Sequence, residues 1–301
     1  MHNHQQVNPS QESGQTLVLV AVLLLGLVAM LGLVLDGGGM YMQRRRMQNA
    51  ADAGAIAGAV VMAQGADNVQ AEAKAREYTM AHNQAQVCEV TIDAARIAVV
   101  AKVGYSTTFA RIVGLEHVTV TARAVAGYAA VGSLHSVAPL AVRDFDYQFG
   151  VPYTIWDDTK DADPNSGQIQ GGYRGWLNLV CVYPMSCGDG GASDLKTWMS
   201  SGYPGDTHVG TWIRGSSGVK TSVIDQAHVG QILMVVVYDA IEPRFPGKDY
   251  YHALKFAAFK VSKVYASGNP KGIQGTFETF FVAGPAGGTE DGGVRTVALM
   301  Q

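Results

Sequence analysis

The chain has 301 residues, of which 48% are hydrophobic and 16% are charged, and its formal net charge at pH 7 is −3. This composition excludes a disordered tail and suffices for one or two domains with a sizeable core beside any membrane segment. A weakly acidic chain offers no basic face, so we expect no nucleic-acid partner.

Residues 1–15 form a short N-terminal segment, and residues 16–35 after it carry no charged side chain. At 1.5 Å per residue, these 20 residues match the roughly 30 Å hydrocarbon core of a bilayer. A cleaved signal peptide is the alternative, but its apolar core is about 7–15 residues long and follows basic residues, whereas no Lys or Arg precedes this stretch. We therefore expect a single transmembrane helix over residues 16–35 that anchors the chain in a lipid bilayer.

Charged residues return directly after this span. The residues expected at the membrane interface are Asp36, Arg44, Arg45 and Arg46. Because the arginines follow the span and none precedes it, the positive-inside rule alone places the C-terminal bulk in the cytoplasm, although long domains translocate largely regardless of charge. Between them, the glycines at 37–39 each cost about 1 kcal/mol of helix propensity and favour a bend.

Small side chains recur at i, i+4 spacing beyond the arginines, at Ala50, Gly54 and Gly58. On a helix they share one face and form a helix-packing interface that another helix can approach closely. Two partners fit. One is a second helix of the same chain over residues 67–82, with Asp67 as its N-cap, and the other is a helix of another subunit.

The remainder of the region 36–136 reads as a small antiparallel sheet. Runs rich in Val, Ile and Thr predict strands over 88–92, 96–103 and 117–131, with a short helix over 107–113. Together with the preceding helices, this pattern predicts an α+β region in which two helices cover the sheet.

Residues 137–301 predict a mainly β domain, either a sandwich or an open barrel. The overall fold class is thus α+β, with one further helix over 193–200. The strands are expected over 151–158, 175–183, 232–241, 254–266, 273–284 and 294–299.

Two cysteines of this domain, Cys181 and Cys187, lie close enough in sequence to close a small disulfide loop in an oxidising compartment. Cys88 is far from both in sequence, so we expect it to be a small buried residue. A zinc site would need a second Cys or His pair at short spacing, which Cys88 is too distant to supply.

An acidic loop contains the start of a calcium-loop pattern at Asp161, Asp163 and Asn165. The pattern is incomplete, because its Gly falls one place late and Gly172 stands where a bidentate Glu is expected. We therefore expect a solvated turn and no metal.

The tryptophans of the β domain allow two interpretations, a packed core and a platform for saccharides, and packing is the favoured one. Nucleophile-elbow, P-loop and dinucleotide-binding patterns are absent from the sequence. We expect no catalytic residues, no cofactor and no small-molecule ligand.

The N-terminal pattern also resembles a known family. Gly14-Gln15-Thr16 and the apolar span are followed by Asp36-Gly37-Gly38, Tyr41, Arg44-Arg45, a Met-Gln-Asn-Ala-Ala-Asp-Ala run at 47–53 and Ala-Gly-Ala at 57–59. This order resembles the TadE/TadG-like proteins of tight-adherence (Flp) pilus assembly over residues 13–60. The likeness is weaker over 87–130 and loose beyond 137.

The resemblance implies a single-pass protein of the cell membrane with a cytoplasmic N-terminus and a body in the periplasm or at the cell surface. This orientation is opposite to the one that the positive-inside rule gives. Many relatives carry basic residues before the span, where this sequence has Glu12. Gly14-Gln15 also resembles a prepilin-type cleavage point, but Leu19 stands where pilin stems usually carry Glu.

The function implied is a structural or assembly component, minor pilin-like or TadG-like, of a Tad/Flp-type pilus apparatus. Its partners would be the lipid bilayer and other pilus-assembly or pilin subunits, including further copies of the chain. The alternative is a membrane-tethered surface binding module, adhesin-like, with a glycan or calcium ligand.

Overall fold

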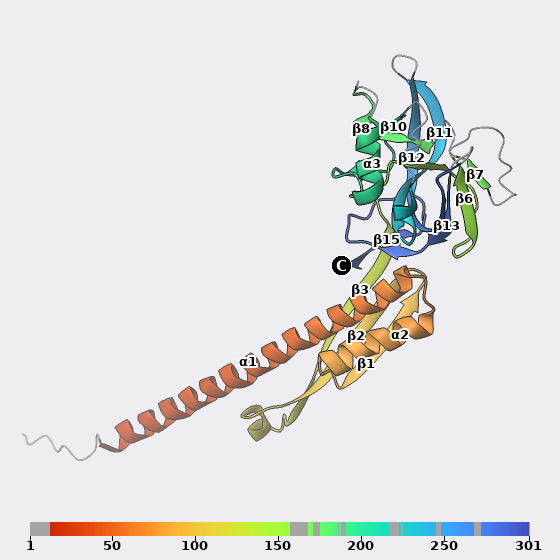
Figure 1. Cartoon of the computed structure of the whole chain (residues 1–301). Coiled ribbons are helices and arrows are strands. Elements are labelled where there is room, and N and C mark those ends of the chain that lie inside the picture. The colour runs from red at the N-terminus through yellow and green to blue at the C-terminus, as the bar shows by residue number, and fades with distance from the viewer. Residues whose placement is uncertain are drawn as a thin grey trace, which may run out of the picture. The chain divides into compact units, whose positions relative to one another are not determined.

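The computed structural model describes residues 13–156, 168–170, 175–185, 187, 191–216, 223, 225–244, 248–267 and 272–300 (Figure 1). The chain forms two compact units from segments that alternate in the sequence. The first comprises 1–55, 74–91 and 98–125, and the second comprises 56–73, 92–97 and 126–301. The boundary expected between residues 136 and 137 stays a prediction about which part folds independently.

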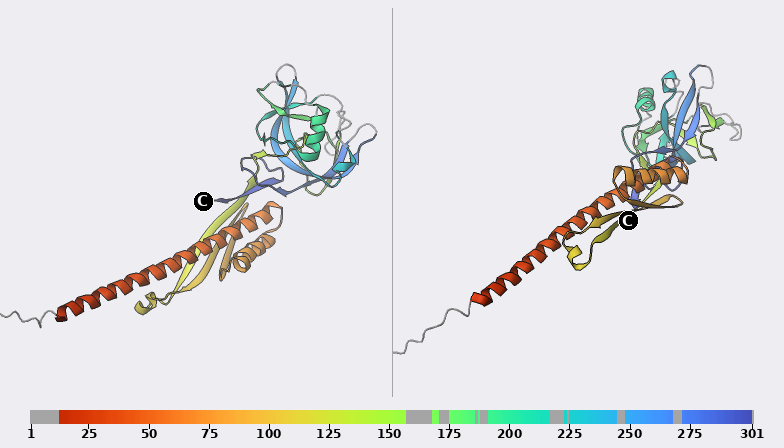
Figure 2. Two further views of the ribbon diagram at one scale, coloured as in Figure 1. Left: turned by 60° about the vertical axis from the view of Figure 1, so that its left-hand side comes forward. Right: turned by 90° about the horizontal axis from the view of Figure 1, so that it is seen from below.

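Helix α1, Ser13–Ala63, is one continuous α-helix of 51 residues (Figures 1 and 2). The expectation of a bend at residues 37–39 is wrong, since the helix passes through these glycines without a break. Its strongly helix-forming flanks outweigh the local propensity cost. Gly39 also leaves room for a neighbour, because a Cβ at that position would collide with the Tyr105 hydroxyl.

The second helix begins where the sequence predicts. The backbone N–H of Gln70 donates a 2.8 Å hydrogen bond to Asp67 Oδ1, which makes Asp67 a side-chain cap. Helix α2, Asn68–Arg76, then continues into a π-helical turn, η1, Glu77–His82.

The predicted strands of the N-terminal region all form. They are β1, Val87–Asp93, β2, Arg96–Ser106, and β3, His117–Ala130, and a 3-10 helix, η2, Ala110–Val113, joins the last two. Along β2 the alternate residues Ile97, Val99 and Ala101 are fully buried, which is the period expected of a strand with one face on a core.

Two strands from the end of the chain complete this sheet, whose order is β1-β2-β3-β15-β14. Strands β14, Phe280–Phe281, and β15, Val294–Met300, are parallel to each other. The backbone N–H of Val131, just after β3, donates to Val294 O at 3.3 Å. The sequence predicts the last strand but gives no sign of this long-range pairing.

The second unit contains an eight-stranded sheet curved into a half-barrel (Figure 2). Its main path is β5-β11-β12-β13-β6-β7, and β10 pairs with both β12 and β8. The bounds are β5 Ala141–Arg143, β6 Pro152–Trp156, β7 Gln168–Gln170, β8 Leu177–Val182, β10 Trp212–Gly215, β11 Ile232–Arg244, β12 Lys248–Tyr265 and β13 Gly272–Glu278.

Smaller elements also belong to this unit. Helix α3, Ala192–Ser201, forms where a helix was predicted, and the short strands β4, Ser133–Leu134, and β9, Thr207–His208, pair with each other. A further 3-10 turn, η5, covers Gln226–His228. The α+β class predicted from the sequence is confirmed.

The core of the second unit is aromatic and aliphatic. Trp176, Tyr251, Phe259 and Phe277 are almost completely buried, and Trp198 on α3 is 8% exposed. Two of the four tryptophans therefore serve packing, which was the favoured interpretation.

Candidate functional site

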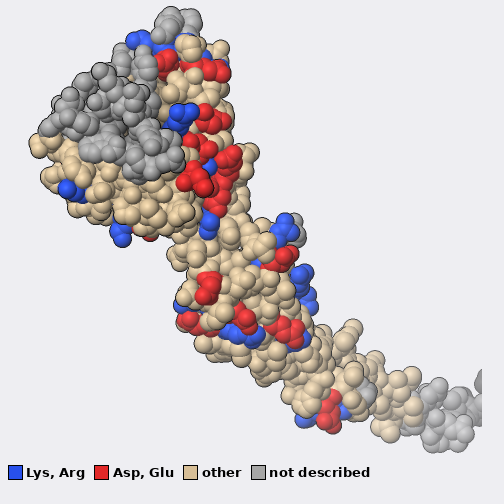
Figure 3. Space-filling view, turned by 90° about the vertical axis from the view of Figure 1, so that its right-hand side faces the viewer, with Lys and Arg blue, Asp and Glu red and all other residues tan. Residues whose placement is uncertain are grey.

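The N-terminal half of α1 is an apolar rod with nothing packed around most of it. From Leu17 to Leu35 the large apolar side chains are 50–75% exposed. In the space-filling view this stretch is tan, without charged side chains (Figure 3). Among the described residues, α1 is the one helix long and apolar enough to cross a membrane. Such a surface is stable only in contact with lipid or apolar protein.

At the end of this rod, Asp36 has partners that the sequence did not reveal. Its side chain is 4% exposed and accepts backbone N–H hydrogen bonds from Thr108 at 2.7 Å, Phe109 at 2.9 Å and Ala110 at 2.7 Å. Asp36 therefore has partners within the chain, and its position at the membrane interface stays a prediction. Its carboxylate caps the turn that leads into η2, whose first N–H groups have no helical partner.

These bonds also favour the ionised carboxylate. The hydrogen bond from Thr108 lowers the pKa of Asp36 most, burial opposes it, and the bonds from Ala110 and Phe109 lower the pKa further. Asp36 therefore stays ionised at pH values below the ordinary pKa of an aspartate.

Two glycines let the end of β2 and the β2–β3 connection lie against α1. A Cβ at Gly32 would come within 2.7 Å of the Phe109 Cβ, and one at Gly39 would collide with Tyr105. Gly32, Asp36 and Gly39 follow i, i+4, i+7 spacing and so share one face of the helix. That spacing is the signal by which sequence reasoning could have found this contact.

The predicted helix-packing residues are buried inside the chain. Ala50 has no exposed surface, and Gly54 and Gly58 are also buried. A Cβ at Gly54 would collide with Thr79 Oγ1 and lie 2.9 Å from Ala75 O. Gly54 therefore packs against the second helix of the same chain, and contact of this face with another subunit stays a prediction.

The three arginines expected at the membrane interface, Arg44–Arg46, are exposed on α1. Arg44 lies nine residues beyond Leu35, or about 13 Å along the helix axis. Their contact with lipid head groups stays a prediction.

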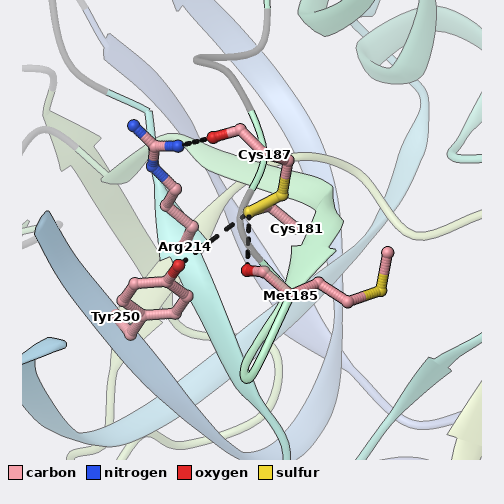
Figure 4. The surroundings of a disulfide bond; sticks show 5 residues. All are labelled: Cys181, Met185, Cys187, Arg214 and Tyr250. Atoms are coloured by element: carbon pink, nitrogen blue, oxygen red, sulfur yellow. Dashed lines mark hydrogen bonds between the residues drawn. A yellow bond between two sulfur atoms is a disulfide. The ribbon is translucent and has the colours of Figure 1, made fainter. Parts of the chain in front are cut away.

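Cys181 and Cys187 form a disulfide, with their Cα atoms 5.8 Å apart (Figure 4). Cys181 is fully buried, and its Sγ lies 3.7 Å from Met185 O and 4.0 Å from the Tyr250 hydroxyl. The Arg214 guanidinium donates a hydrogen bond to Cys187 O. Cys88 is a free, buried thiol, as the sequence suggested.

The chain offers little for ligand chemistry in the part that the structure describes. The calcium candidates Asp161, Asp163 and Asn165 lie outside the described residues. Within them, no three His, Cys, Asp or Glu side chains are grouped to hold a metal.

Trp212 is the half-buried tryptophan that the saccharide interpretation would need. The Arg244 guanidinium lies over its ring, 3.8 Å from the centroid, and the His252 ring is 5.0 Å away. One ring face is therefore already occupied by a cation from the same chain.

Comparison with known proteins bears on the N-terminal segment. Residues 14–63 match the sequence model of the family described as Putative Flp pilus-assembly TadE/G-like. This segment is TadE/G-like. The resemblance noted over residues 13–60 is thereby confirmed, and the TadE/G-like segment holds the apolar rod, Asp36, the arginines and the buried small residues. No curated protein and no solved structure matched the chain.

Proposed function

We propose that this protein is a membrane-anchored structural or assembly component, minor pilin-like or TadG-like, of a Tad/Flp-type pilus apparatus. The observation that carries the proposal is the coincidence of the TadE/G-like match, residues 14–63, with helix α1, Ser13–Ala63. The matched part of α1 begins with the exposed apolar stretch, residues 17–35, and ends with a segment that is packed within the chain around Ala50 and Gly54. This combination suits mechanical anchoring. The role is structural rather than catalytic, in keeping with a family described by assembly.

The orientation that we propose has the N-terminus in the cytoplasm and the body outside the membrane. The disulfide between Cys181 and Cys187 supports it, because such bonds persist in oxidising compartments and are rare in the cytosol. The arginines at 44–46 argue the other way. A folded body as long as this one is less sensitive to such charges, so the disulfide carries more weight.

Other subunits would contact the face of α1 that the chain leaves uncovered. Tyr41 is 70% exposed and Met42 is 59% exposed, both just beyond the span. Large apolar side chains in this position are suited to contact with a neighbouring helix. The partner surface is thus the side bearing Tyr41 and Met42, not the side bearing Gly54.

The test is site-specific photocrosslinking in cells that assemble the pilus. Met42 is replaced by photoreactive benzoylphenylalanine, and Met80, which is 40% exposed on η1, is replaced in a matched control. We expect a discrete adduct with a pilus-assembly or pilin subunit, or with a second copy of this chain, at position 42 alone. Normal piliation without an adduct at 42, or the same adduct at 80, would contradict the proposed face.

The alternative remains a tethered surface binding module with a glycan or calcium ligand. The described residues favour it less, because Trp176 and Trp198 are committed to the core and Arg244 covers Trp212. Binding of the full-length protein to glycan arrays or to calcium, retained in cells without a pilus, would favour this alternative instead.

A further inference from the structure

The connection between β2 and β3 exposes large apolar side chains at its tip. Ile112 is 80% exposed and Leu115 is 58% exposed. Both belong to the ten-residue connection 107–116, in which polar side chains would be expected at exposed positions. Arg111 beside them is also exposed. Exposed apolar side chains mark a contact surface when they belong to a larger apolar patch, so the position of this connection along α1 decides their meaning.

The tip lies at the depth of the last turn of the apolar rod. Phe109 packs against Gly32, which is three residues, or about 4.5 Å, before the end of the uncharged stretch 16–35. The three hydrogen bonds to Asp36 hold the tip at this level. The contact belongs to a single compact unit of the structure.

The neighbouring surface indicates what covers the tip. On the adjacent turn of α1, Leu33 is 75% exposed and Val34 is 65% exposed, and in a bilayer these side chains face acyl chains. The contacts of Phe109 with Gly32 and Asp36 hold the connection that carries Ile112 and Leu115 at this depth. Arg111 supplies a cation suited to lipid phosphates at the boundary.

We propose that the β2–β3 tip inserts Ile112 and Leu115 into the bilayer leaflet on the C-terminal side of the span, as a second membrane contact beside α1. The tip then fixes the depth of α1 in the bilayer and the angle at which this helix leaves it. The inference rests on the proposed membrane anchoring, but not on the orientation or on the pilus role.

The test measures the depth of nitroxide labels by electron paramagnetic resonance. Full-length protein with Cys88→Ala, which leaves the disulfide intact, is reconstituted in vesicles of phosphatidylcholine and phosphatidylglycerol. Single labels are placed through Ile112→Cys and, separately, Leu115→Cys. Leu23→Cys reports the span, and Met80→Cys is the control, since the neighbouring Thr79 packs at Gly54, about 33 Å along α1 from Gly32.

We expect the ratio of oxygen to nickel-chelate collision at 112 and 115 to exceed that at 80 by a factor of roughly three or more, because the polar chelate is excluded from acyl chains. A value like that at 80, or a label shielded from both reagents by protein, would overturn the proposal. If position 23 also reads as aqueous, the membrane anchoring itself fails. If 23 reads as lipid while 112 and 115 do not, only the tip proposal fails.

Discussion

The carboxylate of Asp36 accepts a 2.7 Å hydrogen bond from the backbone N–H of Thr108, 72 residues further along the chain. This bond and its two neighbours satisfy N–H groups at the end of the apolar rod, where water is scarce and an unpaired N–H is costly. Asp36 is therefore the residue that fastens the β2–β3 tip to α1.

Replacing Asp36 by Ala should release the tip while leaving the sheet intact. We expect amide hydrogen exchange at Thr108, Phe109 and Ala110 to accelerate by about tenfold or more, because their acceptor is lost. Asp52→Ala is the matched control, since Asp52 lies on the same helix and accepts from Gln48 at 2.8 Å. Equal effects of the two substitutions, or none at the tip amides, would refute this role.

The same bonds predict an acid-sensitive tip. Because the pKa of Asp36 is lowered in the folded protein, its stabilising contribution is fully present above the unfolded value of about 3.9 and is lost as the pH falls through the lower folded pKa. The amide resonance of Thr108 in micelles should titrate below that value in the native protein and not in Asp36→Asn. A midpoint at or above 3.9 would show that the bonds do not favour the carboxylate.

Gly54 and Gly38 should respond in opposite ways to Ala. At Gly54 the added Cβ meets Thr79 and the backbone of Ala75, so we expect the free energy of unfolding to fall by about 1–3 kcal/mol. At Gly38 the Cβ meets nothing within 4 Å, so helix propensity should raise it by up to about 1 kcal/mol. Denaturant unfolding in detergent measures both, and a neutral Gly54→Ala would mean that the close packing does not form.

The disulfide between Cys181 and Cys187 predicts that the body of the protein lies in an oxidising compartment. Protein alkylated under denaturing conditions without reductant should gain one group, at Cys88, and should gain three after reduction. Intact mass counts the groups directly. In Cys187→Ser the unreduced protein should gain two. Three groups without reductant in the native chain would indicate a reducing compartment and weaken the proposed orientation.

Much of the local structure could be predicted because its causes are local. The alternation of Ile97, Val99 and Ala101 identifies a strand, Asp67 identifies a helix start, and the uncharged run 16–35 identifies a candidate span. Each depends on neighbours only a few residues away, which is where propensity and periodicity act.

The unpredicted features depend on partners far along the chain. The spacing of Gly32, Asp36 and Gly39 indicates a packed face of α1 but does not identify Thr108 as the partner of Asp36. Likewise, the residues around Val294 do not indicate that the last strand joins the sheet containing β3. The bend predicted at residues 37–39 is absent for a related reason. Glycine propensity is a local property, whereas the space at Gly39 is used by Tyr105, which lies far along the chain. For Gly54, spacing gave the interface but could not choose between the two partners.

The central claim is a protein anchored by one membrane helix with its body outside the cytoplasm, where it can join a pilus apparatus. The most direct measurement is protease digestion of a C-terminal tag in cells whose outer envelope is opened while the cytoplasmic membrane stays sealed. The account predicts that the tag is lost while a cytoplasmic marker survives. A tag that stays protected until the membrane is lysed would place the body in the cytoplasm and contradict the account.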